Sequence, residues 1–374
     1  MRMTVDREAL ATALKLTKGA VSSKPVLPVL RYARIDADPK AGAATCTTTN
    51  IDITTSVRLE NAAERSGTAI AEHSRLSAFV SSADGDKVEM ELEDGWLKLR
   101  CGTMKAKLAT MKKELWPKEA PMDKAKTASV EGAKLYRAIS TVKHAALPTA
   151  HAAMSENILL EMDAEGLTAV ATDGKTLATW RSDAGRGLKD KAPGVTLGKQ
   201  AWSVLETLTE NAAHSVKIEY TAYESVRVTG PGGRWTLRAK VPPVQYPEWR
   251  KILLAATNDD YKTYTLDRQG MVRALRGMVS LLPQTADWTT VKMTLSEKGA
   301  RFSGTGEGVD ATVATDESAE GAEGIVNTLD AKRLLRTLEA VADDKVKLGV
   351  TDSMSPVTFE TPQTYGMMMP LRCA

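Results

Sequence analysis

The residues best placed to do chemistry are Asp173 and Lys175, which flank Gly174 within the stretch Ala171–Ala178. An acid and a base this close together could transfer a proton to and from a substrate. An Asp-Gly pair between two strand-like runs is, however, typical of a tight turn, because these residues tolerate a positive φ. We therefore expect a β-hairpin here, and an enzyme that uses Asp173 and Lys175 is the weaker hypothesis.

The sequence offers no better catalytic or metal site. Its four histidines, His73, His144, His151 and His214, are dispersed, without the spacing of metal ligands. It contains neither a Gly-x-Ser-x-Gly motif nor a Gly-x-x-x-x-Gly-Lys-Ser/Thr motif, and the glycine-rich run 304–308 is more typical of a turn. We expect no catalytic residue, no metal and no cofactor.

The composition is that of a soluble globular protein, with 374 residues of which 43% are hydrophobic and 26% charged. This length predicts two or three domains. The formal net charge of +3 is too small to indicate nucleic-acid binding without local clustering of bases. Three scattered cysteines, no signal peptide and no long apolar run predict a cytoplasmic protein that does not enter a membrane.

The elements that must position the hairpin recur three times along the chain. Segments that begin at Met3, Ala128 and Tyr264 each pass from a short strand into an acidic first turn and then into a helical pattern. Apolar residues at i, i+3, i+4 and i+7 predict one buried face for each helix. These residues are Leu10, Ala13, Leu14 and Thr17, then Leu135, Ala138, Ile139 and Val142, then Met271, Ala274, Leu275 and Met278.

A second helix and further strands also recur in each copy. Helical patterns at 73–83, 198–210 and 330–342 are each followed by strands with period-2 alternation, and more β-rich segments lie between the two helices. Their expected buried residues are Leu76, Phe79 and Val80, then Trp202, Leu205 and Leu208, then Leu334, Leu335 and Leu338. Chance similarity of amphipathic helices is the alternative, but the matching order of elements argues against it. The sequence predicts an α+β fold of three tandem copies, two helices against antiparallel sheets, at residues 1–125, 126–254 and 255–374.

Basic residues gather on the expected helices beyond their first turns. Compensation of the helix dipole is one explanation, with acids at the start and bases toward the end. The other is that these helices face a polyanion and contact its phosphates without reading sequence. Charge alone does not separate the two. The bases are Lys15, Lys18, Lys134, Arg137, Lys143, Arg268, Arg273 and Arg276 on the opening helices, and Arg75, Lys199, Lys332, Arg333 and Arg336 on the second helices.

The end of the sequence, Met367–Ala374, is apolar and rich in methionine. Pro370 prevents a regular strand from continuing through it. A last strand packed into the third copy is the simple interpretation of Met367. For the residues after Met367 the alternative is a flexible apolar surface that binds the apolar side chains of a partner.

Together, these features resemble the bacterial β sliding clamp, the processivity subunit of the replicative DNA polymerase III holoenzyme. The resemblance covers essentially the whole chain. It is carried by the triplicated unit, Ala171–Ala178, Thr351–Ser355 and the Met-Pro-Leu-Arg tail, with further similarity at Lys24–Leu30 and Tyr246–Ile252.

The resemblance implies a non-catalytic homodimer, a head-to-tail ring whose helices line a hole for double-stranded DNA, bound independently of sequence. Basic residues of the lining would contact DNA: Lys24, Arg137, Lys199, Arg273, Arg276, Lys332 and Arg336. The DNA polymerase III α subunit, the clamp loader and other proteins would dock short peptides of the Gln-x-x-Leu-Phe type between the second and third domains. By position, that pocket would use Thr172, Gly174, Lys175, Thr176, Leu177, Pro247, Lys251, Ile252, Met367, Met368, Met369, Pro370, Leu371 and Arg372.

The chain departs from the family at four places. Lys175-Thr176 stands where a His-Arg pair is usual, so that the pocket wall loses a guanidinium. Residues 152–155 are smaller than expected near the pocket, and His73-Ser74 replaces a basic pair on a lining helix. Ala106 stands where the family often buries an aromatic residue across the dimer interface, so that loss of this anchor would weaken the ring. A monomeric adaptor that binds partners without DNA is therefore a third hypothesis, beside the clamp and the enzyme.

Overall fold

The structure is a computed structural model that describes residues 1–60, 62–149, 154–162, 166–183, 194–221, 224–256, 261–282, 289–306, 308–316 and 324–371. The chain divides into two compact units. Unit 1 comprises Met1–Tyr136 and Leu197–Pro242, and unit 2 comprises Arg137–Thr196 and Pro243–Ala374. The middle copy of the repeat contributes to both units, and the three-domain division at residues 125 and 254 stays a prediction.

The same order of elements occurs three times, as the sequence predicts, with one additional short strand, β5, in repeat 1. Repeat 1 contains β1 Arg2–Asp6, α1 Arg7–Thr17, β2 Tyr32–Asp38, β3 Ala43–Thr49, β4 Ile53–Glu60, β5 Ala63–Arg65, β6 Gly67–Glu72, α2 His73–Ser82, β7 Lys87–Glu93, β8 Trp96–Cys101 and β9 Met104–Ala109. Repeat 2 contains β10 Lys126–Glu131, α3 Gly132–Val142, β11 Ile158–Met162, β12 Leu167–Thr172, β13 Thr176–Arg181, β14 Gly194–Leu197, α4 Lys199–Thr209, β15 Ser215–Tyr220, β16 Ser225–Thr229 and β17 Trp235–Lys240.

A short helix, α5 Trp249–Ala255, precedes the third copy. Repeat 3 contains β18 Lys262–Asp267, α6 Arg268–Leu281, β19 Thr290–Ser296, β20 Gly299–Gly306, β21 Val309–Ala314, β22 Ile325–Asp330, α7 Ala331–Ala340, β23 Lys345–Val350, β24 Val357–Glu360 and β25 Thr364–Met368. Short 3-10 turns lie at Lys18–Ala20, Pro28–Arg31, Lys113–Leu115, Lys143–Ala145 and Pro231–Gly233.

Each opening helix buries the stripe of residues that its periodicity predicts. All four expected residues of α1, of α3 and of α6 are buried. The second helices also bury their expected residues, except Leu335 of α7, which is only half-buried. Buried apolar faces of this kind supply most of the stability of such helices.

Aspartates fix where three of the helices begin. Asp6 accepts a hydrogen bond from the backbone N–H of Ala9 at 2.9 Å, and Asp330 accepts one from that of Lys332 at 3.0 Å. Asp267 caps α6 in the same way through the N–H of Gly270. These acids therefore stand at helix starts because a capping carboxylate satisfies amides that have no partner within the helix.

All the strand pairs are antiparallel, and the strands form four sheets within the described residues. Unit 1 contains a five-stranded sheet, β5-β1-β7-β8-β9, and an eight-stranded sheet, β10-β15-β16-β17-β4-β3-β2-β6. Unit 2 contains an eight-stranded sheet, β14-β11-β12-β13-β25-β24-β23-β18, and a four-stranded sheet, β21-β20-β19-β22.

Both eight-stranded sheets join two successive repeats by the same rule. The last strand of one repeat pairs with the third strand after the opening helix of the repeat before it. In unit 1, β17 pairs with β4 and places Leu237 opposite Thr55. In unit 2, β25 pairs with β13 and places Met367 opposite Leu177. The corresponding strands β9 and β21 have a neighbour on one side only and are edge strands in the described part of the chain.

Candidate functional site

The predicted hairpin is present as β12–β13 in unit 2, but its two central turn residues are Gly174 and Lys175 and not the Asp-Gly pair. Gly174 has a φ of +84°, which favours glycine. Asp173 is not left-handed. Its Oδ1 instead accepts the backbone N–H groups of Lys175 at 2.9 Å and Thr176 at 2.8 Å. The aspartate thus closes the turn with its side chain.

The other carboxylate oxygen of Asp173 binds Arg333, on the first turns of α7. Asp173 Oδ2 accepts from Arg333 Nη1, and the same nitrogen lies 3.4 Å from Thr176 Oγ1. Arg333 Nε lies 3.5 Å from Asp330 Oδ2. The Asp173 side chain is fully buried and that of Arg333 is 18% exposed. The sequence grouped Arg333 with the basic face of this helix, but the structure turns it toward the hairpin.

The tail lies beside this hairpin. Strand β25 is hydrogen-bonded between β13 and β24, and it ends at Met368 before Pro370. Beyond it, the N–H of Met369 donates to Lys175 O at 2.8 Å and that of Leu371 donates to Thr328 O at 2.7 Å. The tail is thus fixed to the hairpin on one side and to β22 on the other.

Helix α5 packs on the same sheet and completes the apolar base of the site. Trp249 and Leu253 of α5 are buried, and they form one cluster with Leu177 of β13 and Met367 of β25. Val170, Ala256 and Tyr365 belong to this cluster as well. The hairpin, the linker and the tail, which the sequence predicted to share a site, therefore share one hydrophobic core.

Two polar anchors hold the linker against β11 and β12. The Tyr246 hydroxyl donates to Val170 O at 3.0 Å, and burial raises the pKa of this phenol. Arg250 binds both carboxylate oxygens of Glu161, at 3.1 and 2.6 Å. The Glu161 side chain is 4% exposed and that of Arg250 15%. This ion pair was not predicted, because sequence periodicity does not reveal which distant acid an arginine side chain contacts.

The residues predicted to line a pocket divide into a buried base and an accessible rim. Buried are Thr172, Thr176, Leu177, Met367 and Met368. Exposed are Gly174, Lys175, Lys251, Ile252 and Met369, with Ile252 37% and Met369 38% exposed. Half-buried are Pro247, Pro370 and Leu371. Arg372 and residues 152–153 lie outside the described residues.

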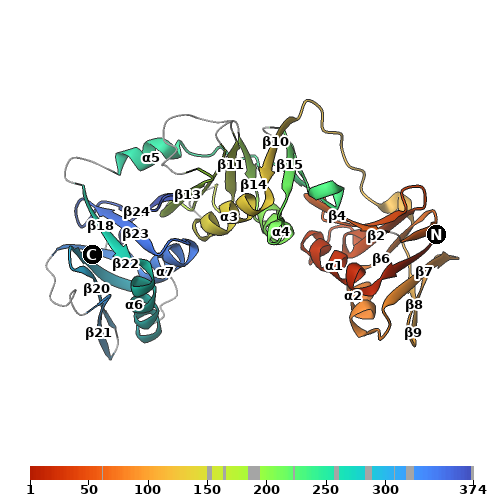
Figure 1. Ribbon diagram of the computed structural model, residues 1–374, viewed down its shortest axis with the longest axis horizontal. Helices are drawn as coiled ribbons and strands as arrows, with labels where there is room; N and C mark the ends of the chain where they lie inside the picture. Colours follow the sequence, from red (N-terminus) through yellow and green to blue (C-terminus); the bar gives the residue numbers. More distant parts are fainter. Residues whose placement is uncertain are drawn as a thin grey trace. The chain divides into compact units, whose positions relative to one another are not determined.

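The basic residues predicted to meet DNA in the third repeat lie on two helices that pack side by side, α6 and α7 (Figure 1). Arg273, Arg276 and Arg336 are exposed and Lys332 is half-buried. Arg276 binds Glu339 of α7 at 2.7 Å, which neutralises part of this surface.

Lys24, Arg137 and Lys199 are exposed as well. Lys24 lies in the loop before the 3-10 turn Pro28–Arg31, Arg137 lies on α3, and Lys199 is the first residue of α4. His73, expected on a basic helix surface, is instead buried against α1, with its Nε2 3.0 Å from Leu14 O. Burial lowers the pKa of His73, so that it adds no charge to the surface at neutral pH.

His144 is a second histidine held in the interior of unit 2. Its Nδ1 lies 2.7 Å from Thr141 O, and its ring lies 6.4 Å from that of Phe359. Burial lowers the pKa of His144 to about 4, so that the imidazole is neutral at neutral pH.

The hairpin does not have the geometry of an acid–base pair. Both oxygens of Asp173 are engaged, one by turn amides and one by Arg333, and its side chain is fully buried. Lys175 is exposed and meets Asp173 only through its backbone N–H. A proton-transfer group has to reach its substrate, so this arrangement does not support the enzyme hypothesis.

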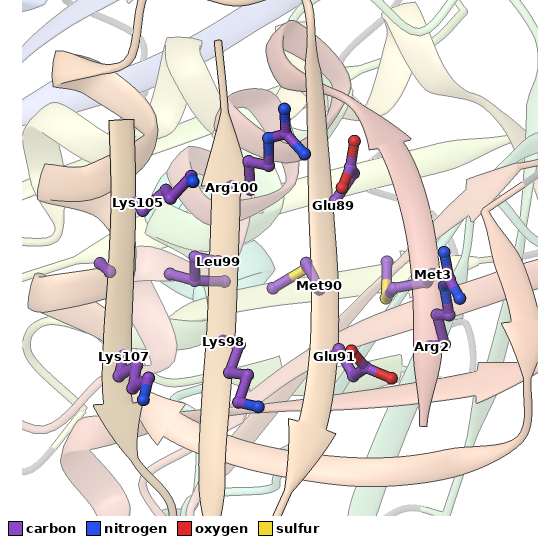
Figure 2. A pocket seen from close by; sticks show the side chains of 11 residues that line it. Arg2, Met3, Glu89, Met90, Glu91, Lys98, Leu99, Arg100, Lys105 and Lys107 are labelled. Carbon is purple, nitrogen blue, oxygen red and sulfur yellow. The ribbon is translucent and has the colours of Figure 1, made fainter. Parts of the chain in front are cut away.

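A separate hollow of about 490 Å³ lies over the five-stranded sheet of unit 1. Figure 2 shows Met3, Met90 and Leu99 in one row across the strands, with charged rows on either side. On β8 and β9 the charged residues are basic: Lys98, Arg100, Lys105 and Lys107. Ala106 is half-buried and lies opposite Leu99, on the edge strand β9.

The described residues contain no cluster of three or more histidine, cysteine or acidic side chains that could hold a metal ion. Among them, no helix combines the length and the apolar composition needed to cross a membrane.

Sequence comparisons find similarity to beta sliding clamps. Residues 1–120 match the family described as DNA polymerase III beta subunit, N-terminal domain. The chain is 20% identical over 377 residues to the beta sliding clamp of Escherichia coli K12, an alignment that covers all of both chains. It is 24% identical over 253 residues to the beta sliding clamp of Pseudomonas aeruginosa, 68% of each chain.

Solved structures of similar fold cover the whole chain. The DNA polymerase sliding clamp of Bacillus subtilis has a TM-score of 0.87 at 17% identity, with 100% of both chains covered. The DNA polymerase III subunit beta of Pseudomonas aeruginosa has a TM-score of 0.83 at 22% identity, again over 100% of both chains. The predicted fold class is thereby confirmed.

Proposed function

Because the chain is related to the bacterial β sliding clamps along its whole length, we propose that it is a DNA sliding clamp. Copies of the chain form a ring around duplex DNA and tether DNA-processing proteins to it. The protein is a non-catalytic processivity factor of a DNA polymerase, and it acts in the cytoplasm. The observation that carries this proposal is the rule by which successive repeats join.

That rule supports a closed ring. Within the chain, the last strand of repeat 2 pairs with repeat 1, and that of repeat 3 pairs with repeat 2. The last strand of repeat 1, β9, would by the same rule pair with β21 in repeat 3 of another copy. Such a head-to-tail junction covers both edge strands, which would otherwise template aggregation. Two chains closed in this way form the homodimer that we propose.

The side chains of the two edge strands support their pairing. Met104, Ala106 and Leu108 form a half-buried apolar row on β9, and Val309, Ala311 and Val313 form one on β21. The opposite sides carry Lys105 and Lys107 on β9 and Asp310 on β21, all exposed. Opposite charges and apolar rows meeting across strands stabilise a pairing.

Encirclement explains how weak DNA contacts are sufficient. The proposed contacts are to DNA phosphates, which are the same whatever the base sequence. They would be made by Lys24, Arg137, Lys199, Arg273, Arg276, Lys332 and Arg336. A ring cannot leave the side of a duplex, so that these contacts need not be tight and sliding stays fast. We expect them to weaken with salt.

The hairpin, α5 and the tail form the proposed docking site for a partner's peptide. Ile252 of α5 and Met369 of the tail are exposed, whereas Leu177 and Met367 belong to the buried cluster that the hairpin, α5 and β25 share. Methionine and leucine walls suit a bound leucine or phenylalanine side chain, because they adapt to an apolar shape. The expected partners are the DNA polymerase III α subunit, the clamp loader and other proteins that carry such a peptide.

The proposal is tested by comparing closed and open DNA. Concentrated protein is mixed with a nicked circular plasmid, diluted, and followed after the plasmid is cut at one site. We expect the protein to leave the cut plasmid at least about tenfold faster than the uncut circle, since a ring escapes only over an end. Sedimentation in parallel should give twice the mass of one chain. Equal loss from circles and linear fragments would contradict the clamp, and a single-chain mass would favour the monomeric adaptor.

Enlarging Ala106 should tighten the ring. Ala106→Leu adds three carbons to the half-buried row on β9 at each of the two junctions of the proposed ring. At about 0.8 kcal/mol per buried CH₂ the gain is about 2.4 kcal/mol per junction before crowding is subtracted, so that we expect dimerisation to strengthen at least about tenfold. Sedimentation of a dilution series measures the change. Ala109→Leu, on the exposed side of the same strand, is the matched control. If both variants tighten the dimer equally, β9 is not paired through its apolar row.

A further inference from the structure

We propose that Arg333 is a positioning residue of the docking site, which sets the shape of the hairpin turn through Asp173. The inference rests on the proposed function of this site. Arg333 lies outside the hairpin, the linker and the tail, so that none of these elements indicates a role for it.

The ion pair between Asp173 and Arg333 is largely buried. The Asp173 carboxylate is fully buried, and a buried carboxylate requires a cation or several donors to remain charged. The turn supplies two amide donors to Oδ1, and Arg333 supplies the only cationic donor among the described residues to Oδ2. Asp173 therefore fixes the turn through its backbone amides, and Arg333 fixes the Asp173 carboxylate through the ion pair.

The Arg333 guanidinium contacts three side chains, so that its orientation is fixed. Nη1 bonds to Asp173 and lies 3.4 Å from Thr176 Oγ1, and Nε lies 3.5 Å from Asp330. Asp330 also caps α7 through the N–H of Lys332 at 3.0 Å. A planar guanidinium engaged at two edges has a fixed orientation, which a lysine at the same place would not reproduce.

The turn is connected to the tail by a backbone hydrogen bond. The backbone carbonyl of Lys175, in the turn, accepts the N–H of Met369 at 2.8 Å. A shift of the turn would therefore move Met369, which forms part of the accessible rim. Arg333, Asp173, the turn and Met369 form one continuous series of contacts from α7 to the apolar rim.

The contact between Arg333 and Thr176 also changes the chemistry of the wall of the docking site. The side chain at position 176 is the small hydroxyl of Thr176, which is buried, and a guanidinium reaches it from α7. The wall of the site thus has a guanidinium beside position 176 although no arginine stands in the hairpin turn. The same helix carries Lys332 and Arg336, so that the ion pair directly joins the two proposed binding surfaces of unit 2.

The test measures peptide binding and local amide exchange in the full chain. The probe is a fluorescein-labelled peptide ending in Gln-x-x-Leu-Phe, followed by anisotropy. Arg333→Met is expected to weaken its binding about tenfold, and Arg333→Lys by an intermediate factor. Amide exchange should accelerate at Lys175, Thr176 and Met369 but not in β7 and β8 of unit 1. Lys347→Met, which removes a partly exposed partner of Glu360 in the same unit, is the control and should leave binding within about twofold.

A double variant separates positioning from stability. Asp173→Asn with Arg333→Met removes the buried charge at position 173, although the buried Asp330 still lacks its contact with the guanidinium. The double variant should therefore recover part of the stability that Arg333→Met alone loses. Peptide binding should nevertheless stay weaker than in the wild type by about threefold or more, because the turn has lost its tether to α7. Wild-type binding in Arg333→Met, or its full recovery in the double variant, would overturn the role of Arg333. Absence of peptide binding in the wild type would instead overturn the docking site itself.

Discussion

Deletion of Met369 and every residue after it is expected to weaken binding of a Gln-x-x-Leu-Phe peptide at least about a hundredfold, or about 2.7 kcal/mol. Strand β25 ends at Met368, so that the deletion leaves the sheet complete. What it removes is the exposed Met369, the half-buried Pro370 and Leu371, and their hydrogen bonds to Lys175 O and Thr328 O. An apolar anchor at the centre of an interface commonly contributes 2 kcal/mol or more, about the loss expected here.

Anisotropy of the labelled peptide measures this loss, and circular dichroism checks the fold. Leu281→Ala is a suitable control, since it removes another exposed apolar side chain of unit 2, at the end of α6. We expect this control to bind the peptide as the wild type does. Unchanged affinity after the deletion would mean that the docking site lies elsewhere.

Arg250→Met should destabilise unit 2 by about 3–5 kcal/mol, because it leaves the Glu161 carboxylate buried without its cation. The change also removes the guanidinium that stacks 4.1 Å from the centre of the Trp249 ring. Trp249 belongs to the cluster that holds α5 on the sheet, so that the effect should reach the docking site. Amide exchange in β11 and α5 measures the loss separately from unit 1.

The neighbouring residue supplies the control for this variant. Lys251 lies 4.0 Å from Glu248, with side chains 81% and 62% exposed, so that Lys251→Met should change stability by less than about 1 kcal/mol. If the two variants destabilise unit 2 equally, the Glu161–Arg250 pair contributes no more than an exposed one. In that case α5 is held by apolar packing alone.

The sequence predicted the helices and the hairpin well, because each is encoded by local pattern. Stripes such as Leu10, Ala13, Leu14 and Thr17 reveal which face of a helix is buried, whatever that face packs against. The Asp-Gly pair predicted the turn, and Pro370 predicted that the last strand stops before it. The resemblance then supplied the interpretation of hairpin and tail as parts of one site.

The long-range polar contacts were not predicted, because a basic side chain on a helix has no pattern that identifies its partner. Arg333 lies 160 positions from Asp173, and Arg250 lies 89 positions from Glu161. On the sequence, Arg333 resembled its exposed neighbour Arg336. His73 was misplaced for a related reason, since a polar residue inside an apolar stripe is indistinguishable by type from one on the surface.

The position of β25 in its sheet has a consequence for how the chain folds during synthesis. This strand lies between β13 and β24, and its pairing with β13 joins residues nearly 190 positions apart. Until residues 364–368 have left the ribosome, β13 and β24 each lack a neighbour on one side. A chain cut short before this point would keep two exposed strand edges and be prone to aggregate, while long-range pairing of this kind forms slowly. The sheet of unit 2 is therefore complete only when residues 364–368 are available to pair with both β13 and β24.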